Sequence, residues 1–482
     1  MSVLLRNVRL VPVTAATSGD LTDVRMEDGK VTELGEPAEQ VIEADGRWLI
    51  PGLWDQHVHF RQWAQARLRL DVGGTTGPAE AVARVREHVD GRSAVVVGAG
   101  FRPATWSEQP TTAHLDAVSS TVPIVLISGD VHSGWLNSAA QRWLGVTARE
   151  GVLDENDWFD LVPHLEELLA ADLDDAYRLA VADASARGVV GVVDMEFESG
   201  FRAWPARFAA GFDGLRVRTA TYAEGLEDVI AAGLRTGSAL GGLATMGPLK
   251  IISDGSLNSR TARCCEPYGD GRFGVQNYPL DELVRLLGRA QSSGLAVALH
   301  AIGDAALTTA LDAFEATGAR GGVEHVQLAR FADFDRMALL GLRASIQPAH
   351  LLDDRDVAAE IWPDRVDRCY AFGSMLAAGI ELALGSDAPV SPLDPWLAMA
   401  AAVHRSADAR EPWNPAESLT PAQALRASVD GQATVAVGSP ADLVLVEADP
   451  LAIGDPSEVA AHLRDMRVAA TFVAGRATHL TI

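Results

Sequence analysis

The sequence predicts an α/β protein organised around a (β/α)8 TIM barrel, with an insertion after the first barrel strand and a small β-sandwich formed by both termini. Two observations support this fold class. Apolar strand-like runs alternate with helical patterns through the middle of the chain, which is typical of parallel βα units. Short apolar segments separated by turn residues fill both ends, as in a small antiparallel β unit.

The two ends of the chain supply the predicted sandwich. In residues 1–52 the apolar segments are short, and Asp28 followed by Gly29 is the signal of a hairpin turn. Residues 429–482 hold two further strand candidates and are predicted as the second part. Two β-rich ends that flank a long middle favour one sandwich built from both.

The barrel is predicted over residues 53–428. The interval between its first two strand candidates is too long for one crossover, so we predict an insertion over about residues 73–165, beside the barrel mouth. With eight parallel βα units, a closed barrel is the simplest arrangement. The eight strand candidates are residues 53–59, 189–194, 215–222, 249–253, 296–300, 322–325, 344–347 and 382–387.

Composition limits the partners and the compartment. The formal charge of −25 argues against nucleic acid and anionic membranes, since either would repel this surface. No uninterrupted apolar run is long enough to span a membrane, and the start of the chain lacks the pattern of a signal peptide. Three cysteines make no disulfide framework. We expect a cytoplasmic protein with a small-molecule substrate, and composition leaves a homo-oligomer open.

Two histidines end the first barrel strand. Side chains alternate along a strand, so His57 and His59 point the same way. Two imidazoles on one face form half of a divalent-metal site, which suits zinc or its neighbours. Paired histidines also occur on ordinary solvated strands, so a metal site requires ligands from other strand ends.

Further candidate ligands stand at the ends of later strands. His300 and His325 each end a strand, on the face where such barrels place their catalytic residues. Asp387 closes the last strand. Taken singly, such a histidine is more often a hydrogen-bonded core residue, and such an aspartate is more often a helix cap. Together with the first pair they make a specific pattern.

Lys250 is unusual because Lys30 is the only other lysine of the chain. Arginine keeps its proton in proteins, whereas a buried lysine can lose it. A neutral amine can take up carbon dioxide as a carbamate, whose two oxygens could bridge two metals. The alternative is a core lysine that extends to the surface. The rarity of lysine here favours the functional interpretation.

These six residues, in this order, resemble the ligand set of the metal-dependent amidohydrolase superfamily. Several motifs resemble the branch that contains the N-substituted formamide deformylases, and the likeness extends over nearly the whole chain. The motifs are GDVHSGWLNS (129–138), DGS (254–256), HAIGD (300–304), EHVQL (324–328) and GSDAP (385–389).

The resemblance implies a barrel with two divalent metal ions, usually zinc, bridged by a carbamylated Lys250. It implies that His57, His59 and Asp387 hold one metal and that His300 and His325 hold the other. The hypothesis that follows is hydrolysis of a non-peptide carbon–nitrogen bond, in an N-substituted formamide or related amide, by a metal-activated water.

Two residues have catalytic roles in this hypothesis. Asp387 would accept the proton of the water and pass it to the leaving nitrogen. His132, in the predicted insertion, is the candidate donor to the oxyanion, with the alternative that it only caps a loop.

Two alternatives stay open. The first is a deaminase of the same superfamily, but such enzymes usually place a glutamate three residues after the histidine that corresponds to His300, and here that residue is Gly303. The second is a binding protein that has lost catalysis, against which the complete set of candidate ligands argues.

Overall fold

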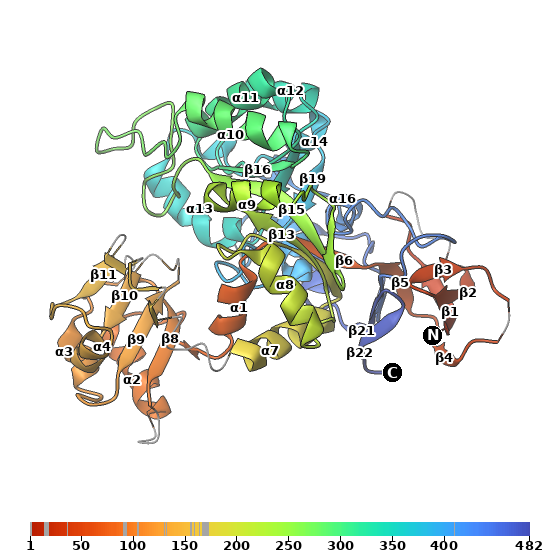
Figure 1. The fold of residues 1–482 in the computed structure, drawn as a ribbon, viewed down its shortest axis with the longest axis horizontal. Coiled ribbons are helices and arrows are strands. Elements are labelled where there is room, and N and C mark those ends of the chain that lie inside the picture. Colours follow the sequence, from red (N-terminus) through yellow and green to blue (C-terminus); the bar gives the residue numbers. More distant parts are fainter. Residues whose placement is uncertain are drawn as a thin grey trace. The chain divides into compact units, whose positions relative to one another are not determined.

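The computed structural model describes the chain except residues 1, 14–18, 36, 90–93, 104–105, 130, 132, 155–156, 159, 163, 166–172 and 409. It divides into two compact units, one made of residues 1–60 and 181–482 and the other of residues 61–180. The elements are drawn in Figure 1. Among the described residues, no helix combines the length and apolar character that a membrane span needs. All three cysteines are free thiols.

The larger unit contains a parallel eight-stranded barrel (Figure 1). Its strands follow one another in chain order around the sheet, and the short antiparallel strand β14 (Ala239–Gly241) adds to one of them. Every predicted barrel strand is present. Their bounds are β6 Leu53–Val58, β12 Val189–Asp194, β13 Arg216–Thr221, β15 Ala244–Ile252, β16 Val297–Ala301, β17 Gly321–His325, β18 Arg343–Ile346 and β19 Leu382–Leu384.

The first and last strands meet at their carboxyl ends. Val58 and Ala388 form a parallel bridge. The backbone N–H of Asp387 donates to the carbonyl of His57 at 2.7 Å, and that of His59 donates to the carbonyl of Ala388 at 2.9 Å. This contact brings the two ends of the barrel sheet together where the candidate ligands lie.

Burial on both faces explains the composition of these strands. All six residues of β12, VVGVVD, are buried, as expected of a parallel strand covered on both sides. Gly191 interrupts this run because a Cβ there would overlap the indole of Trp54 on the neighbouring strand. The glycine therefore allows β6 and β12 to pack closely.

Helices follow most of the strands. The helix α10 packs one apolar face inward through Leu283, Leu286, Leu287 and Ala290, which recur at helical spacing. The helices are α1 Phe60–Ala66, α7 Leu173–Ala186, α8 Gly200–Ala209, α9 Leu226–Ala231, α10 Leu280–Ser292, α11 Asp304–Thr317, α12 Phe331–Leu339, α13 His350–Ile361, α14 Phe372–Ala377, α15 Pro395–His404, α16 Pro421–Arg426 and α17 Pro456–Arg464.

Strands from both ends of the chain share one eight-stranded sheet of the larger unit. The link is an antiparallel pairing of β20 with β5, in which Leu443 lies opposite Pro51 and Val446 opposite Trp48. The description of this region as a sandwich stays a prediction. The strands are β1 Ser2–Leu10, β2 Leu21–Glu27, β3 Lys30–Thr32, β4 Gln40–Glu43, β5 Trp48–Pro51, β20 Leu443–Val446, β21 Val468–Val473 and β22 Arg476–Leu480.

Residues 61–180 form a unit with a five-stranded sheet of its own. Its core includes Phe101, Trp106 and Trp135, whose rings contact one another. The predicted insertion, about residues 73–165, falls inside this unit, and its bounds and those of the other predicted domains stay predictions. The elements are β7 Leu70–Asp71, β8 Val96–Phe101, β9 Ile124–Ser128, β10 Ser133–Leu136, β11 Val152–Asp154, α2 Pro78–His88, α3 Thr112–Asp116 and α4 Ser138–Trp143.

Candidate metal centre

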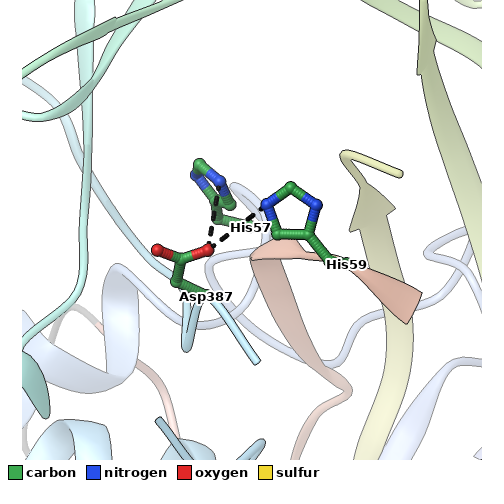
Figure 2. Close-up of side chains that lie close together, drawn as sticks. All are labelled: His57, His59 and Asp387. Carbon is green, nitrogen blue, oxygen red and sulfur yellow. Dashed lines mark ion pairs between the residues drawn. The ribbon is translucent and has the colours of Figure 1, made fainter. Parts of the chain in front are cut away.

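The carboxyl ends of the barrel strands bring the predicted histidines and Asp387 together. His57 is the last residue but one of β6, His59 directly follows that strand, and Asp387 follows β19. The Nε2 atoms of both histidines lie 3.5 Å from Oδ1 of Asp387, so the two rings and the carboxylate converge (Figure 2). Their ligand atoms lie within 4.8 Å of one another, close enough to hold one metal ion.

A second group uses the same carboxylate. His325, His350 and Asp387 also place ligand atoms within 4.8 Å of one another. His350, the first residue of α13, has its Nε2 3.9 Å from Oδ2 of Asp387. His350 is not among the ligands that the sequence predicts, and the structure adds it to the candidate ligands.

His300 lies beside this second group without belonging to it. Its ring centroid is 4.6 Å from that of His325. Its Nε2 lies 3.2 Å from Oδ1 of the buried Asp254 and 3.3 Å from the carbonyl of Gly255. These two oxygens occupy Nε2, so His300 can offer only Nδ1 to a metal.

The donor chemistry of these groups fits a divalent metal. Burial lowers the pKa of His59, against the opposing effect of Asp387. Burial, followed by the neighbouring His300 and His57, lowers the pKa of His325 well below its usual range. These lowered pKa values favour the neutral rings, which is the form that binds metal. In addition, Nδ1 of His59 and Nε2 of His350 are buried without a hydrogen-bond partner among the described residues.

The neighbours of Asp387 favour its ionised form in spite of its burial. Burial would raise its pKa, but the neighbouring His57, His59, His350 and Lys250 outweigh that effect and hold the pKa below its ordinary value. Its backbone has φ 58°, in the left-handed region that favours glycine. Such strain is found where a fold must aim a functional side chain.

Lys250 lies inside the barrel beside the first group. It is 2% exposed, and its Nζ lies 3.2 Å from Nε2 of His57. Burial lowers the pKa of Lys250, although Glu324 and Asp387 act in the opposite direction. The alternative that this lysine extends to the surface is therefore wrong.

Glu324 is a site residue that the sequence interpretation missed. Its Oε2 lies 2.6 Å from Nδ1 of His57, and both side chains are buried. Burial would raise its pKa, but His57 and then Lys250 hold it below the ordinary value. An ionised Glu324 accepts a hydrogen bond from the Nδ1–H of His57. This leaves the lone pair of Nε2 in the same ring for a metal.

Asp55 joins the two segments that carry the first group. Its Oδ1 accepts from the backbone N–H of His57 and from that of Ser386, each at 3.0 Å. Burial raises the pKa of Asp55 to about 6. The available sequence signal was a carboxylate two residues before His57, on the same strand face. His132, the predicted oxyanion donor, lies outside the described residues.

Comparison with known proteins identifies the family. A profile of the amidohydrolase family matches residues 40–479. The chain is 27% identical to the protein LONG AFTER FAR-RED 3 of Arabidopsis thaliana, over 90% of this chain and 80% of that one. It is 26% identical to an N-substituted formamide deformylase of Arthrobacter pascens, over 91% of this chain and 90% of that one.

A solved structure agrees with the fold. An uncharacterised metal-dependent hydrolase of Pyrococcus horikoshii OT3 superposes with a TM-score of 0.77 at 25% identity, and the match covers 94% of this chain and 99% of that chain. The barrel, the histidine groups around Asp387 and the family match agree with one another. The chain is a metal-dependent hydrolase that belongs to the amidohydrolase family.

Proposed function

We propose that this hydrolase cleaves a non-peptide carbon–nitrogen bond, in an N-substituted formamide or a related amide. The observation that carries the proposal is the place of Asp387, an ionised carboxylate shared by two groups of histidines. The similarity to an N-substituted formamide deformylase over nine-tenths of the chain supports the class of substrate.

The predicted histidines and Asp387, together with His350, would hold two divalent metals. His57, His59 and Asp387 would hold one, and His325 would hold the other with His300 through Nδ1 or with His350. Zinc is the metal we expect from neutral imidazoles and a carboxylate. When bound, the metals supply Lewis acidity, which makes water a nucleophile near neutral pH and polarises a carbonyl.

Lys250 would bridge the metals as a carbamate. Its lowered pKa and its burial beside His57 favour the neutral amine. That amine would attack the carbon of CO2, form an N–C bond and release one proton, which leaves a carbamate with two oxygen donors. In the unmodified lysine, the single Nζ offers only one donor.

The side chains of this protein would carry the proton transfer. Asp387 would accept a proton from the attacking water and deliver it to the substrate nitrogen as the C–N bond breaks. The products would be formate, or another carboxylate, and an amine. Glu324 and Asp254 hold the rings of His57 and His300 in fixed orientations, so little reorganisation is needed during the reaction.

The deaminase alternative is disfavoured by the backbone around Gly303. A Cβ at this position would overlap the backbone of Arg263, including its carbonyl. The glutamate that a deaminase of this superfamily would place here therefore has no room. This observation favours an amide hydrolase.

The test combines metal analysis with an assay of N-substituted formamides. We expect two metals per chain in the wild type, fewer in Lys250→Ala and in the bulkier Lys250→Met, and loss of hydrolysis in both. Lys30→Ala is the matched control, because Lys30 is exposed and is the only other lysine. Asp387→Asn should abolish turnover.

Two results would overturn the proposal. If the wild type held metal but hydrolysed no formamide or amide of a broad panel, the proposed class of substrate would be wrong. Equal metal content in wild type and both Lys250 variants, with activity kept, would remove the bridging role. Carbon-13 NMR with labelled bicarbonate tests the carbamate directly, since its signal should be absent from Lys250→Met.

A further inference from the structure

An aromatic strip follows the carboxyl ends of three neighbouring barrel strands. Phe197, just after β12, stacks on His59 with ring centroids 5.6 Å apart and an interplanar angle of 25°. Tyr222 directly follows β13, the next strand of the sheet. Its ring stacks on that of Phe197, with centroids 4.7 Å apart and an interplanar angle of 25°. The strip therefore begins at a candidate metal ligand and extends away from the metal centre.

Phe197 is exposed although it is apolar. Phe197 is 61% exposed, whereas Tyr222 is only partly exposed and the side chain of His59 is 15% exposed. A phenyl ring left in water beside a catalytic group represents apolar surface that a bound molecule can cover. The barrel core does not need this side chain, since most of its surface faces solvent.

Hydrogen bonds position the tyrosine and the backbone of this strip. The hydroxyl of Tyr222 donates to the carbonyl of Met195 at 2.7 Å. The backbone N–H of Phe197 donates to Oε1 of Glu196 at 3.0 Å, and that of Met195 donates to the carbonyl of Val58 at 2.7 Å. The backbone that carries the phenyl ring is therefore bonded to the same strand end that carries His57 and His59.

We infer that Phe197 determines specificity by contacting an apolar, preferably aromatic, substituent on the nitrogen of the amide substrate. In the proposed reaction the amide nitrogen receives its proton from Asp387, so the substituent on that nitrogen begins near His59, whose ring lies close to both Asp387 and Phe197. Aromatic rings gain from edge-to-face or offset contact beyond simple burial. This inference rests on the proposed function for the reacting bond.

The kinetic test compares two substrates that differ only in this substituent. Phe197→Ala should lower kcat/KM for N-benzylformamide about tenfold or more and that for N-methylformamide less than about twofold. Phe197→Leu, which keeps apolar bulk without a ring, should fall between. Leu339→Ala is the control, because Leu339 ends α12 and is 88% exposed. It should change neither value.

A binding test separates this inference from the proposed function. N-benzylmethanesulfonamide and N-methylmethanesulfonamide are not hydrolysed, so calorimetry on the metal-loaded protein reports binding even if no formamide is turned over. The expected result is a Kd about tenfold higher for the benzyl probe in Phe197→Ala, with metal content unchanged. Failure of the proposed function would appear as binding without hydrolysis.

Three outcomes would overturn the inference. Equal affinity of the wild type for the two probes, or failure to bind either, would show that no apolar substituent is recognised. An equal loss of affinity for both probes in Phe197→Ala would show that the substitution disturbs the whole site. Loss of metal in that variant would show that the ring only supports His59.

Discussion

Oε2 of Glu324 lies 2.6 Å from Nδ1 of His57, and Nε2 of the same ring lies 3.5 Å from Oδ1 of Asp387. One nitrogen of the imidazole thus bonds to the buried carboxylate of Glu324, and the other nitrogen faces the carboxylate of Asp387. A ring held in this way keeps a single tautomer, which lowers the cost of binding a metal.

The first prediction concerns this orientation. Glu324→Gln keeps the size of the side chain but removes the charge that holds the Nδ1 proton of His57. We expect metal affinity to fall by about 10- to 100-fold, as is typical when a partner of a metal-binding histidine is lost. Competition with a chromogenic chelator measures this change.

The matched control is Asp333→Asn. Asp333 is also a buried carboxylate, but it lies on α12 and accepts from Thr308 and Arg330. Metal affinity should stay at the wild-type value in this variant. An unchanged affinity in Glu324→Gln would show that Glu324 does not orient a ligand.

The second prediction concerns His350. If Nε2 of His350 helps to hold a metal with His325 and Asp387, His350→Gln should weaken one metal site about tenfold or more and leave the other in place. Titration of the metal-free protein, followed by metal analysis, would show one tight and one weakened site. The control His479→Gln changes a histidine on β22, in the sheet of the chain ends. Two unchanged sites in His350→Gln would leave the second metal to His325 and His300.

The third prediction concerns pH. Burial, followed by the neighbouring Glu196, raises the pKa of Asp194 from 3.8 to about 7. Between these values the folded chain keeps a proton that the unfolded chain has released, so the free energy of unfolding falls as pH rises through this window. One such group contributes at most about 1.4 kcal/mol per pH unit.

Urea denaturation of the metal-free protein at several pH values tests this dependence. Asp194→Asn cannot titrate, so it should lose less stability than the wild type as the pH rises from about 5 to 7. Asp335 is exposed on α12, and Asp335→Asn should keep the wild-type profile. Parallel profiles for the wild type and Asp194→Asn would contradict the raised pKa.

The fourth prediction concerns the turn after β16. Gly303→Ala places a Cβ against the backbone of Arg263, so part of the structure must shift. We expect destabilisation of about 1–3 kcal/mol, as for other overpacked sites, seen as a lower Tm. In the control Gly288→Ala, the new Cβ would meet only Thr317 at 3.9 Å on helix α10, so the Tm should be kept or raised. If Gly303→Ala kept the wild-type Tm, a side chain would fit at this position. A deaminase would then no longer be disfavoured.

Much of this architecture could be predicted because it depends on simple periodicities. Alternation along β6 puts His57 and His59 on one face, and eight apolar runs between helices indicate the barrel. The rarity of lysine identified Lys250 before its burial was known. Each of these signals depends only on the order or composition of the residues.

The missed residues depend on geometry that no local pattern contains. Glu324 directly precedes His325, and alternation would place the two on opposite faces of β17. Instead, Glu324 bonds to His57 while the ring of His325 lies 5.0 Å from the same histidine. The left-handed backbone of His325, with φ 72°, accompanies this arrangement. His350 lies beyond its strand, at the start of a helix, where strand alternation gives no guidance.

The pairing of β5 with β20 has a consequence for how the protein is made. Pro51 ends β5 and Leu53 begins β6, so the strand that carries His57 leaves directly from the sheet of the chain ends. One edge of β5 pairs with residues 443–446, which are synthesised almost 400 residues later. Throughout translation that edge is an open template for association with other chains. Correct pairing of this edge therefore competes with association between chains until residues 443–446 have been made.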